Sequence, residues 1–307
     1  TTFIDDGVEM KCVDESGGEA AVHVVARRGD ADMMMKLIRA GADVNARTAD
    51  GSTALCIGCE GGHVGIVRAL VDAGAGVDGV QGPYGWTALQ VAAMHGYVDV
   101  LALLIGAGPD VDARTSGGTS AVYFSSQSGQ AGALRALLDA GADVDGVQGP
   151  DDEAAMHVAA KRGHGDVVAM LISAGADVKA RDACGRTALV LGCREGHADV
   201  VRALIDAGAE VNGEQGRGGE APLVVAAAEG HWAVVTILIS AGADVDATNA
   251  DGDTALGLAS TSASVEAVRA LIGAGANLNG GQRPDGWTPL HRAGRAGSDR
   301  KSTRLNS

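Results

Sequence analysis

A short motif, A-G-A-D-V with its variants, recurs along the chain at an almost constant spacing. The intervals between its glycines are 33, 34, 33, 34, 33, 34 and 33 residues. The glycines are Gly41, Gly74, Gly108, Gly141, Gly175, Gly208, Gly242 and Gly275. Self-similarity at such a period is typical of repeat architectures, in which each repeat is one supersecondary unit. The period therefore predicts an array of repeats along most of the chain.

The repeats come in pairs, one with a shorter connection and one with a connection longer by one residue. The longer connections carry a glutamine every 67 residues, at Gln81, Gln148, Gln215 and Gln282. For this reason the glycine-rich stretch VDGVQGP occurs twice, at residues 77–83 and 144–150. A phosphate-binding P-loop needs a lysine after its last glycine, and no lysine follows either copy. These glycines are therefore interpreted as turns and not as a nucleotide site.

Each repeat carries two short segments with a helical pattern. In the repeat at residues 51–77, Thr53 is placed to cap a first helix, and two glycines separate that helix from a second. The second helix has apolar residues at spacings of three and four, and Gly74 follows its last turn. Such a helix pair cannot enclose its own apolar face, so the pairs must stack on one another. We expect eight pairs, with first helices beginning near Glu19, Ser52, Trp86, Thr119, Glu153, Arg186, Glu220 and Asp253, and a ninth cut short after Trp287.

These features resemble the ankyrin repeat family. The family pattern is matched across residues 18–297, and WTPLHRAG at residues 287–294 is one of its closest copies. The resemblance implies an all-α solenoid of stacked helix-turn-helix units with extended, hairpin-like connectors. We expect the array at residues 18–298, with repeats starting near positions 18, 51, 85, 118, 152, 185, 219, 252 and 286.

The two ends lie outside this pattern. Residues 1–17 are expected to form an N-terminal extension or a partial repeat. The last nine residues, DRKSTRLNS at 299–307, match what a sequencing adapter would encode, so we interpret them as an artefact tail. A genuine basic tail is the alternative interpretation.

The family's histidine in the first helix resembles a hydrogen-bonding strut between neighbouring repeats. It is kept here at His23, His157 and His291, whereas the other repeats have Cys56, Gln90, Tyr123, Val190, Val224 or Gly257 at that position. The resemblance then implies looser coupling where the histidine is missing, most of all near Gly257.

Composition limits the possible partners. The net charge of −15 disfavours nucleic acid, because phosphate binding needs clustered Lys and Arg. Nothing in the sequence resembles a signal peptide, and no apolar run approaches the roughly 20 residues that a bilayer requires, so we expect no membrane insertion. The five cysteines show no disulfide spacing. We therefore expect an intracellular, cytoplasmic protein, and a monomer.

We expect neither a metal nor a cofactor. Cys56 and Cys59 with His63 could form half of a metal site, but a small buried residue is what packing demands where Cys59 and Cys193 stand. Histidines at 63, 164, 197 and 231 recur in the register of the repeats, which favours struts over catalysts. No nucleophile–base arrangement stands outside the repeat pattern, so we expect no enzymatic activity.

Binding is the expected function, and the resemblance implies a concave face formed by the connector tips and the first helices. Candidate partner-binding residues on that face are Arg47, Tyr84, Trp86, Met94, His95, Arg114, Tyr123, Lys161, Arg162, Arg181 and Arg194. Aromatic and arginine side chains are common hot-spot types. Tyr84 and Trp86 lead the set, although Trp86 could equally cover the adjacent repeat. Arg47, Arg114 and Arg181 could meet an acidic partner or pair with the aspartates four residues before each of them.

The sequence thus predicts a non-catalytic scaffold or adaptor that binds a protein partner. An alternative is the interaction or regulatory region of a larger enzyme or signalling protein, and a third possibility is a purely structural spacer.

Overall fold

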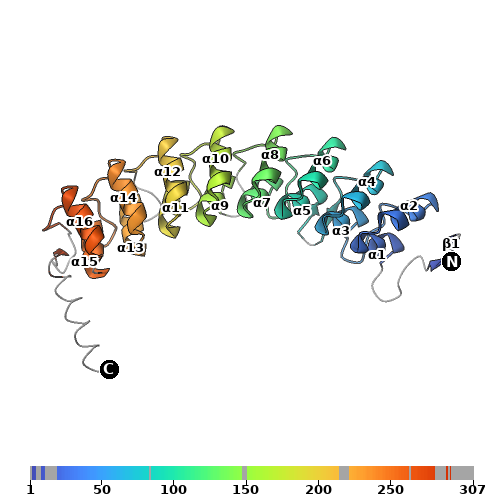
Figure 1. The fold of residues 1–307 in the computed structure, drawn as a ribbon, viewed down its shortest axis with the longest axis horizontal. Coiled ribbons are helices and arrows are strands. Elements are labelled where there is room, and N and C mark those ends of the chain that lie inside the picture. The colour runs from blue at the N-terminus through green and yellow to red at the C-terminus, as the bar shows by residue number, and fades with distance from the viewer. Residues whose placement is uncertain are drawn as a thin grey trace, which may run out of the picture. The chain divides into compact units, whose positions relative to one another are not determined.

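A computed structural model describes residues 2–4, 8–10, 19–82, 84–146, 151–213, 221–262, 264–280, 288, 289 and 291. It comprises two compact units, Thr1–Pro150 and Asp151–Ser307 (Figure 1). The expected tail at 299–307 lies outside the described residues, as do nearly all of the expected N-terminal extension and ninth repeat.

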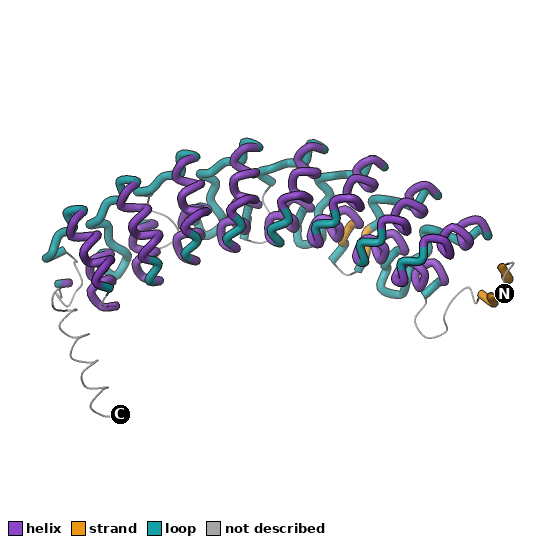
Figure 2. The backbone as a smooth tube through the Cα atoms, in the orientation of Figure 1, coloured by secondary structure: helices purple, strands orange, loops and turns teal. Residues whose placement is uncertain are grey.

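The first unit contains four helix pairs in two layers. The pairs are α1 (Ala21–Arg28) with α2 (Ala31–Arg39), α3 (Ala54–Glu60) with α4 (Val64–Asp72), α5 (Ala88–His95) with α6 (Val98–Gly106), and α7 (Ala121–Gln127) with α8 (Ala131–Asp139). The first helix of each pair contacts the first helix of the next, and the second helices do the same (Figure 2). A hairpin of β3 (Val80–Gln81) and β4 (Trp86–Thr87) precedes α5, and β1 (Thr2–Ile4) pairs with β2 (Val8–Met10), both antiparallel.

The second unit repeats this two-layered arrangement. Its pairs are α9 (Ala155–Arg162) with α10 (Gly165–Ser173), α11 (Ala188–Glu195) with α12 (Ala198–Asp206), α13 (Pro222–Glu229) with α14 (Trp232–Ser240), and α15 (Ala255–Ser262) with α16 (Val265–Gly273). Each helix again contacts its counterpart in the next pair. The described residues of the two units therefore confirm the eight expected helix pairs and the all-α repeat architecture.

Local sequence signals start and end these helices. Thr53 accepts a hydrogen bond from the Cys56 amide at 3.3 Å, which confirms it as the N-cap of α3. All eight motif glycines have φ between 77° and 92° and follow the second helices, where glycine reaches the left-handed region without a steric penalty.

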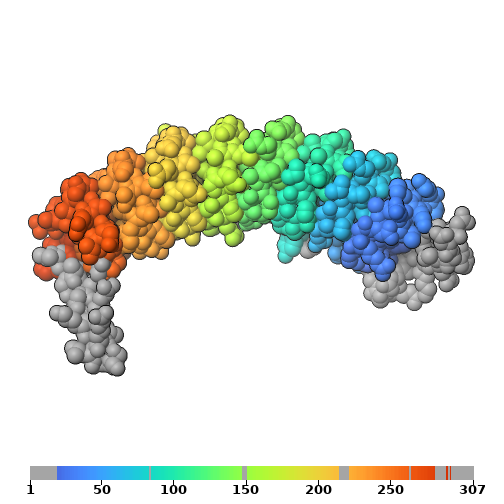
Figure 3. Space-filling model, viewed as in Figure 1, coloured from blue at the N-terminus to red at the C-terminus, as the bar shows by residue number. Residues whose placement is uncertain are grey.

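Small and branched aliphatic side chains form the core. Six consecutive residues of α3, from Ala54 to Cys59, are buried because neighbouring repeats cover this short helix on both sides. The second helices bury one face only, as in α4, where Ile66, Val67 and Leu70 are fully buried. In Figure 3, side chains fill the space between successive helix pairs within each unit. A core of short side chains thus matches the low aromatic content of 3%.

A ladder of side-chain oxygens joins successive connectors. In the first unit, the Asn45, Asp78 and Asp112 side chains accept bonds from the amides of Gly76, Asp110 and Asp143, at 2.8, 3.0 and 2.9 Å. In the second unit, Asn212 and Asp246 accept from the amides of Asp244 and Asn277 at 2.8 and 2.7 Å. The remaining junction of that unit has Lys179, whose ammonium lies 3.3 Å from the Glu210 carboxylate. The connectors are therefore fixed to one another as well as to the helices.

Candidate functional site

The connector between α4 and α5 presents the most exposed large hydrophobic side chain among the described residues of the first unit. Its hairpin places Gln81 opposite Trp86 and Val80 opposite Thr87. Tyr84 lies between the two strands and is 66% exposed, and Val80 is 47% exposed. The Tyr84 side chain has no hydrogen-bond or ring partner among the described residues.

Neighbouring connectors hold the backbone of this hairpin from both sides. The Arg47 guanidinium donates to the Val80 carbonyl at 2.6 Å and to the Gly51 carbonyl at 3.1 Å. On the other side, the Tyr84 carbonyl accepts from the amide and the hydroxyl of Ser116 at 2.9 and 3.1 Å. The exposed Tyr84 ring thus stands on a backbone that is already ordered, which lowers the entropy cost of binding through it.

Aromatic side chains gather beside this connector. Trp86 stacks on Phe124 of the next repeat with ring centroids 4.4 Å apart, and Tyr123 meets Phe124 edge-on at 6.4 Å. Phe124 is buried, whereas Trp86 and Tyr123 are half-buried. The chain has only three Trp, three Tyr and two Phe, and five of these eight aromatic residues lie between positions 84 and 124. We name Tyr84, Trp86 and Tyr123 the aromatic patch.

Arg47, Arg114 and Arg181 each bind a backbone carbonyl of their own connector tip. Arg114 and Arg181 donate to the carbonyls of Gly118 and Gly185 at 3.2 and 2.9 Å, as Arg47 does to Gly51. The aspartates four residues earlier instead accept from backbone amides, as Asp43 does from Asn45 at 2.9 Å. Arg47 and Asp43 therefore do not pair, and this guanidinium stabilises the connector backbone.

The candidates at the ends of the first helices differ in how freely they reach solvent. His95 is exposed and stacks on Tyr97 with centroids 5.5 Å apart, and Met94 is half-buried. In the second unit, the Lys161 ammonium lies 3.4 Å from the buried Glu153 carboxylate, while Arg162 is exposed without a partner among the described residues. Arg194 is half-buried, and its carbonyl lies 2.9 Å from Nε2 of His231. The first unit holds Arg47, Tyr84, Trp86, Met94, His95, Arg114 and Tyr123, and the second holds Lys161, Arg162, Arg181 and Arg194.

Sequence reasoning missed the role of Gln90. In the histidine-containing repeats, Nδ1 of His23 and of His157 accepts from the N-cap amide at 3.0 Å, and Nε2 reaches a connector carbonyl 23 residues on. Gln90 makes the same set of bonds, since its Oε1 accepts from the Thr87 amide at 2.9 Å and its Nε2 donates to the carbonyls of Ala113 and Thr119 at 2.7 and 3.2 Å. The expectation of looser coupling was therefore wrong at this repeat. The Thr-x-x-Gln spacing of a capping box was the signal that could have identified it.

Three cysteines and one of the motif histidines are packed within or between the repeats. Cys56, Cys59 and Cys193 are buried free thiols, and burial raises the pKa of each. The described residues contain no group of three or more His, Cys, Asp or Glu side chains that could hold a metal ion. A Cβ atom at Gly196 would lie within 2.5 Å of the His231 ring, so this histidine packs directly on the preceding repeat. No helix of the described ranges is long and apolar enough to span a bilayer.

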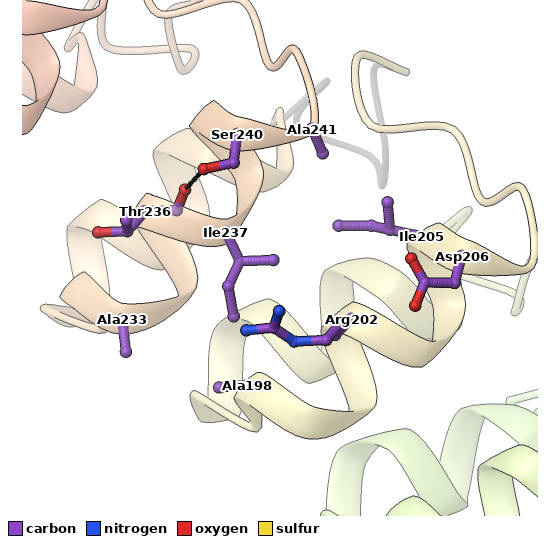
Figure 4. Close-up of a pocket in the computed structure, with 9 residues that line it drawn as sticks. All are labelled: Ala198, Arg202, Ile205, Asp206, Ala233, Thr236, Ile237, Ser240 and Ala241. Carbon is purple, nitrogen blue, oxygen red and sulfur yellow. Dashed lines mark hydrogen bonds between the residues drawn. The ribbon is translucent and has the colours of Figure 1, made fainter.

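A groove also lies on the second-helix layer of the second unit, and none of the candidate residues named above lines it. Ala198, Arg202 and Asp206 of α12 line one side, and Ala233, Ile237 and Ser240 of α14 line the other (Figure 4). We name it the outer groove.

Comparison with known proteins agrees with this architecture. A family model described as ankyrin repeats (3 copies) matches residues 3–81, 22–115, 73–148, 106–182, 156–249 and 223–301. Acyl-CoA-binding domain-containing protein 1 from Arabidopsis thaliana is 40% identical over 55 residues. That stretch covers 18% of this chain and 16% of the relative's length.

Proposed function

Because the chain belongs to the ankyrin repeat family, whose members are generally protein–protein interaction modules, we propose that it is a non-catalytic scaffold or adaptor. The partner binds the aromatic patch, with Tyr84 as the central anchor. The observation that carries this proposal is the exposed, unpartnered Tyr84 ring on a connector braced from both sides.

Three physical points support the choice of this patch over the other candidates. Tyrosine and tryptophan provide large contact areas with few rotatable bonds, and they are enriched among hot spots. The braced backbone has little freedom left to lose on binding. The Arg47 guanidinium is already engaged with two carbonyls, so that much of its hydrogen-bonding capacity serves the fold.

The second candidate function is the interaction region of a larger enzyme or signalling protein. The similarity to the Arabidopsis thaliana protein favours it, because the matched stretch is a small part of a protein whose name refers to a further domain. Assembly of the full-length transcript distinguishes this candidate, since a second domain would be visible at once. The four described cysteines are free thiols, which supports a reducing compartment such as the cytoplasm.

Affinity capture with the purified chain, followed by binding measurements with the captured protein, tests the anchor. We expect Tyr84→Ala to weaken binding about tenfold or more, because removing a hot spot costs about 2 kcal/mol. The fold should be largely unaffected, since the side chain is 66% exposed and makes no hydrogen bond or ring stacking with the described residues. Trp86→Ala combined with Tyr84→Ala should weaken capture further.

Asp151 supplies the matched control. It occupies the position of Tyr84 in the next long connector, and its carbonyl accepts from the Ala183 amide at 2.8 Å as that of Tyr84 does from Ser116. Asp151→Ala should leave binding unchanged. Unchanged binding of the Tyr84→Ala variant would remove the aromatic patch from the site.

A further inference from the structure

The outer groove carries two opposite charges that the fold leaves unused. Arg202 and Asp206 lie four residues apart on α12, and both are exposed. This spacing allows an ion pair along a helix, yet neither side chain has an ion-pair or hydrogen-bond partner among the described residues. Both charges are therefore free to meet another molecule.

Both walls of the groove also offer apolar contact. The hydroxyls of Thr236 and Ser240 donate to carbonyls of their own helix at 3.0 and 2.9 Å, so they present no free donor. Ile205 and Ile237 are half-buried, and Ala198 and Ala233 leave room at one end. In Figure 4 the side chains of Ile237 and Arg202 point toward one another across the groove. A helix with small and aliphatic side chains could approach this surface closely.

The order of the two charges along α12 determines which kind of partner can bind in the outer groove. An acidic segment would pair with Arg202 but be repelled by Asp206, and a basic segment would meet the reverse problem. A partner surface can pair with both side chains only when it places an acidic group against Arg202 and a basic group against Asp206. Helix α12 itself meets this requirement when it is turned antiparallel, because a two-fold axis brings residue i of one copy against residue j of the other.

We propose that a second copy of this chain docks in the outer groove. The α12 helices of the two copies lie antiparallel, and Arg202 of each pairs with Asp206 of the other. This departs from the monomer expected from the sequence. It involves none of the partner-binding candidates, so it stands or falls separately from the proposed function. The net charge of −15 opposes association, so the dimer is weak and forms at high protein concentration.

Sedimentation equilibrium of the full chain over a concentration series tests the proposal. The wild type should self-associate to a dimer. Arg202→Asp and Asp206→Arg should each weaken the dimer at least tenfold, because each places like charges in contact. Combining both substitutions in one chain restores the alternating order, so the double variant should dimerise within about threefold of the wild type. An equimolar mixture of the two single variants should associate more strongly than either alone, because an all-acidic face then meets an all-basic one.

Arg135 is the matched control, since it stands 67 residues earlier at the same position of α8. Arg135→Asp should leave dimerisation unchanged, and circular dichroism should show that all variants are folded. A wild type that remains monomeric throughout overturns the proposal. So does a double variant that fails to recover, or an Arg135→Asp variant that is weakened as much as Arg202→Asp.

Discussion

In the first unit, His23 and Gln90 each extend a side chain from a first helix to the connector of the following repeat, 23 residues further along the chain. Among the described residues of the second unit, His157 makes such a bond. In the three repeats that follow it, the same position holds Val190, Val224 and Gly257, none of which has a polar side chain. Two units with the same fold therefore differ in how their helices are coupled to the connectors.

The short connectors differ in the opposite direction, because a side chain of the connector accepts more backbone amides in the second unit than in the first. In the first unit, the hydroxyls of Thr48 and Thr115 each accept one amide, from Ser52 at 2.9 Å and Thr119 at 3.1 Å. At the equivalent positions of the second unit, one side-chain oxygen accepts two amides. Asp182 accepts from Cys184 and Arg186 at 2.9 and 2.8 Å, and Asn249 from Asp251 and Asp253 at 3.1 and 2.8 Å.

A connector can therefore be fixed from outside, by a side chain that reaches it from a helix, or from within, by its own side chain. Substitutions at the strut position should therefore matter most in the first unit, and substitutions in the connector tip should matter most in the second.

The largest effect is expected for Gln90→Ala. Gln90 is 1% exposed, and its loss would leave the Thr87 amide and the carbonyls of Ala113 and Thr119 without this partner. Because an unsatisfied buried group costs about 1–3 kcal/mol, we expect a destabilisation of about 3 kcal/mol in urea unfolding. Hydrogen exchange should accelerate at residues 113–119.

Gln90→His is the control for that experiment, since His23 and His157 make the equivalent bonds in their own repeats. It should retain most of the stability. An alanine variant within about 1 kcal/mol of the wild type would show that the strut does not fix this connector.

A somewhat smaller effect is expected for Asp182→Ala, at about 2 kcal/mol. The carboxylate accepts two amides, and its Oδ2 lies 2.7 Å from the Arg186 guanidinium. Burial by itself raises the pKa of Asp182, but the bonds from Arg186 outweigh it and hold the pKa below the ordinary value. The folded state thus gains stability above an ordinary pKa of about 4, and loses it as the pH falls through the lowered value.

Asp182→Asn separates the two contributions, because Asn249 performs the amide-binding role without a charge. Chemical denaturation should place this variant between the wild type and Asp182→Ala. If Asp182→Ala unfolds at the same denaturant concentration as Thr115→Ala, the two kinds of connector tip do not differ in strength.

The smallest effect is the pH response of His157. Burial lowers the pKa of this imidazole, although the Ala180 carbonyl and the nearby Asp182 and Glu153 carboxylates act in the opposite direction. Because Nδ1 accepts the Ala154 amide, a proton there would break that bond. The contribution is therefore complete above the ordinary histidine pKa of about 6.5 and is lost as the pH falls below it.

Thermal unfolding at pH 7.5 and pH 5.5 checks this response. The midpoint of the wild type should fall more than that of His157→Gln, which keeps the bonds seen at Gln90 but does not titrate. Equal shifts in both proteins would exclude His157 as the source.

The repeat architecture was predictable because its signals are local. The motif glycines, the Thr53 cap and the apolar spacing of the second helices each specify a short stretch of backbone. The same repeat spacing places Tyr84 in a connector, where an exposed side chain is expected. The role of Trp86 could not be decided in that way, because its stacking depends on Phe124, which is 38 residues away along the chain and adjacent only in space.

The remaining features depend on the paths of two connectors at once. The bond from Arg47 to the Val80 carbonyl joins residues 33 apart, and no pattern in either stretch specifies it. The outer groove was equally hidden, since it results from small side chains on two separate helices.

Among the described bonds between successive connectors, the one between Lys179 and Glu210 is of a different kind. Elsewhere a side-chain oxygen holds a backbone amide, whereas Lys179 and Glu210 form an ion pair between side chains that are 58% and 55% exposed. Dissolved ions screen such an exposed pair strongly but a short amide bond only slightly. A rise in ionic strength should therefore weaken this junction of the second unit more than the junctions held by amide hydrogen bonds.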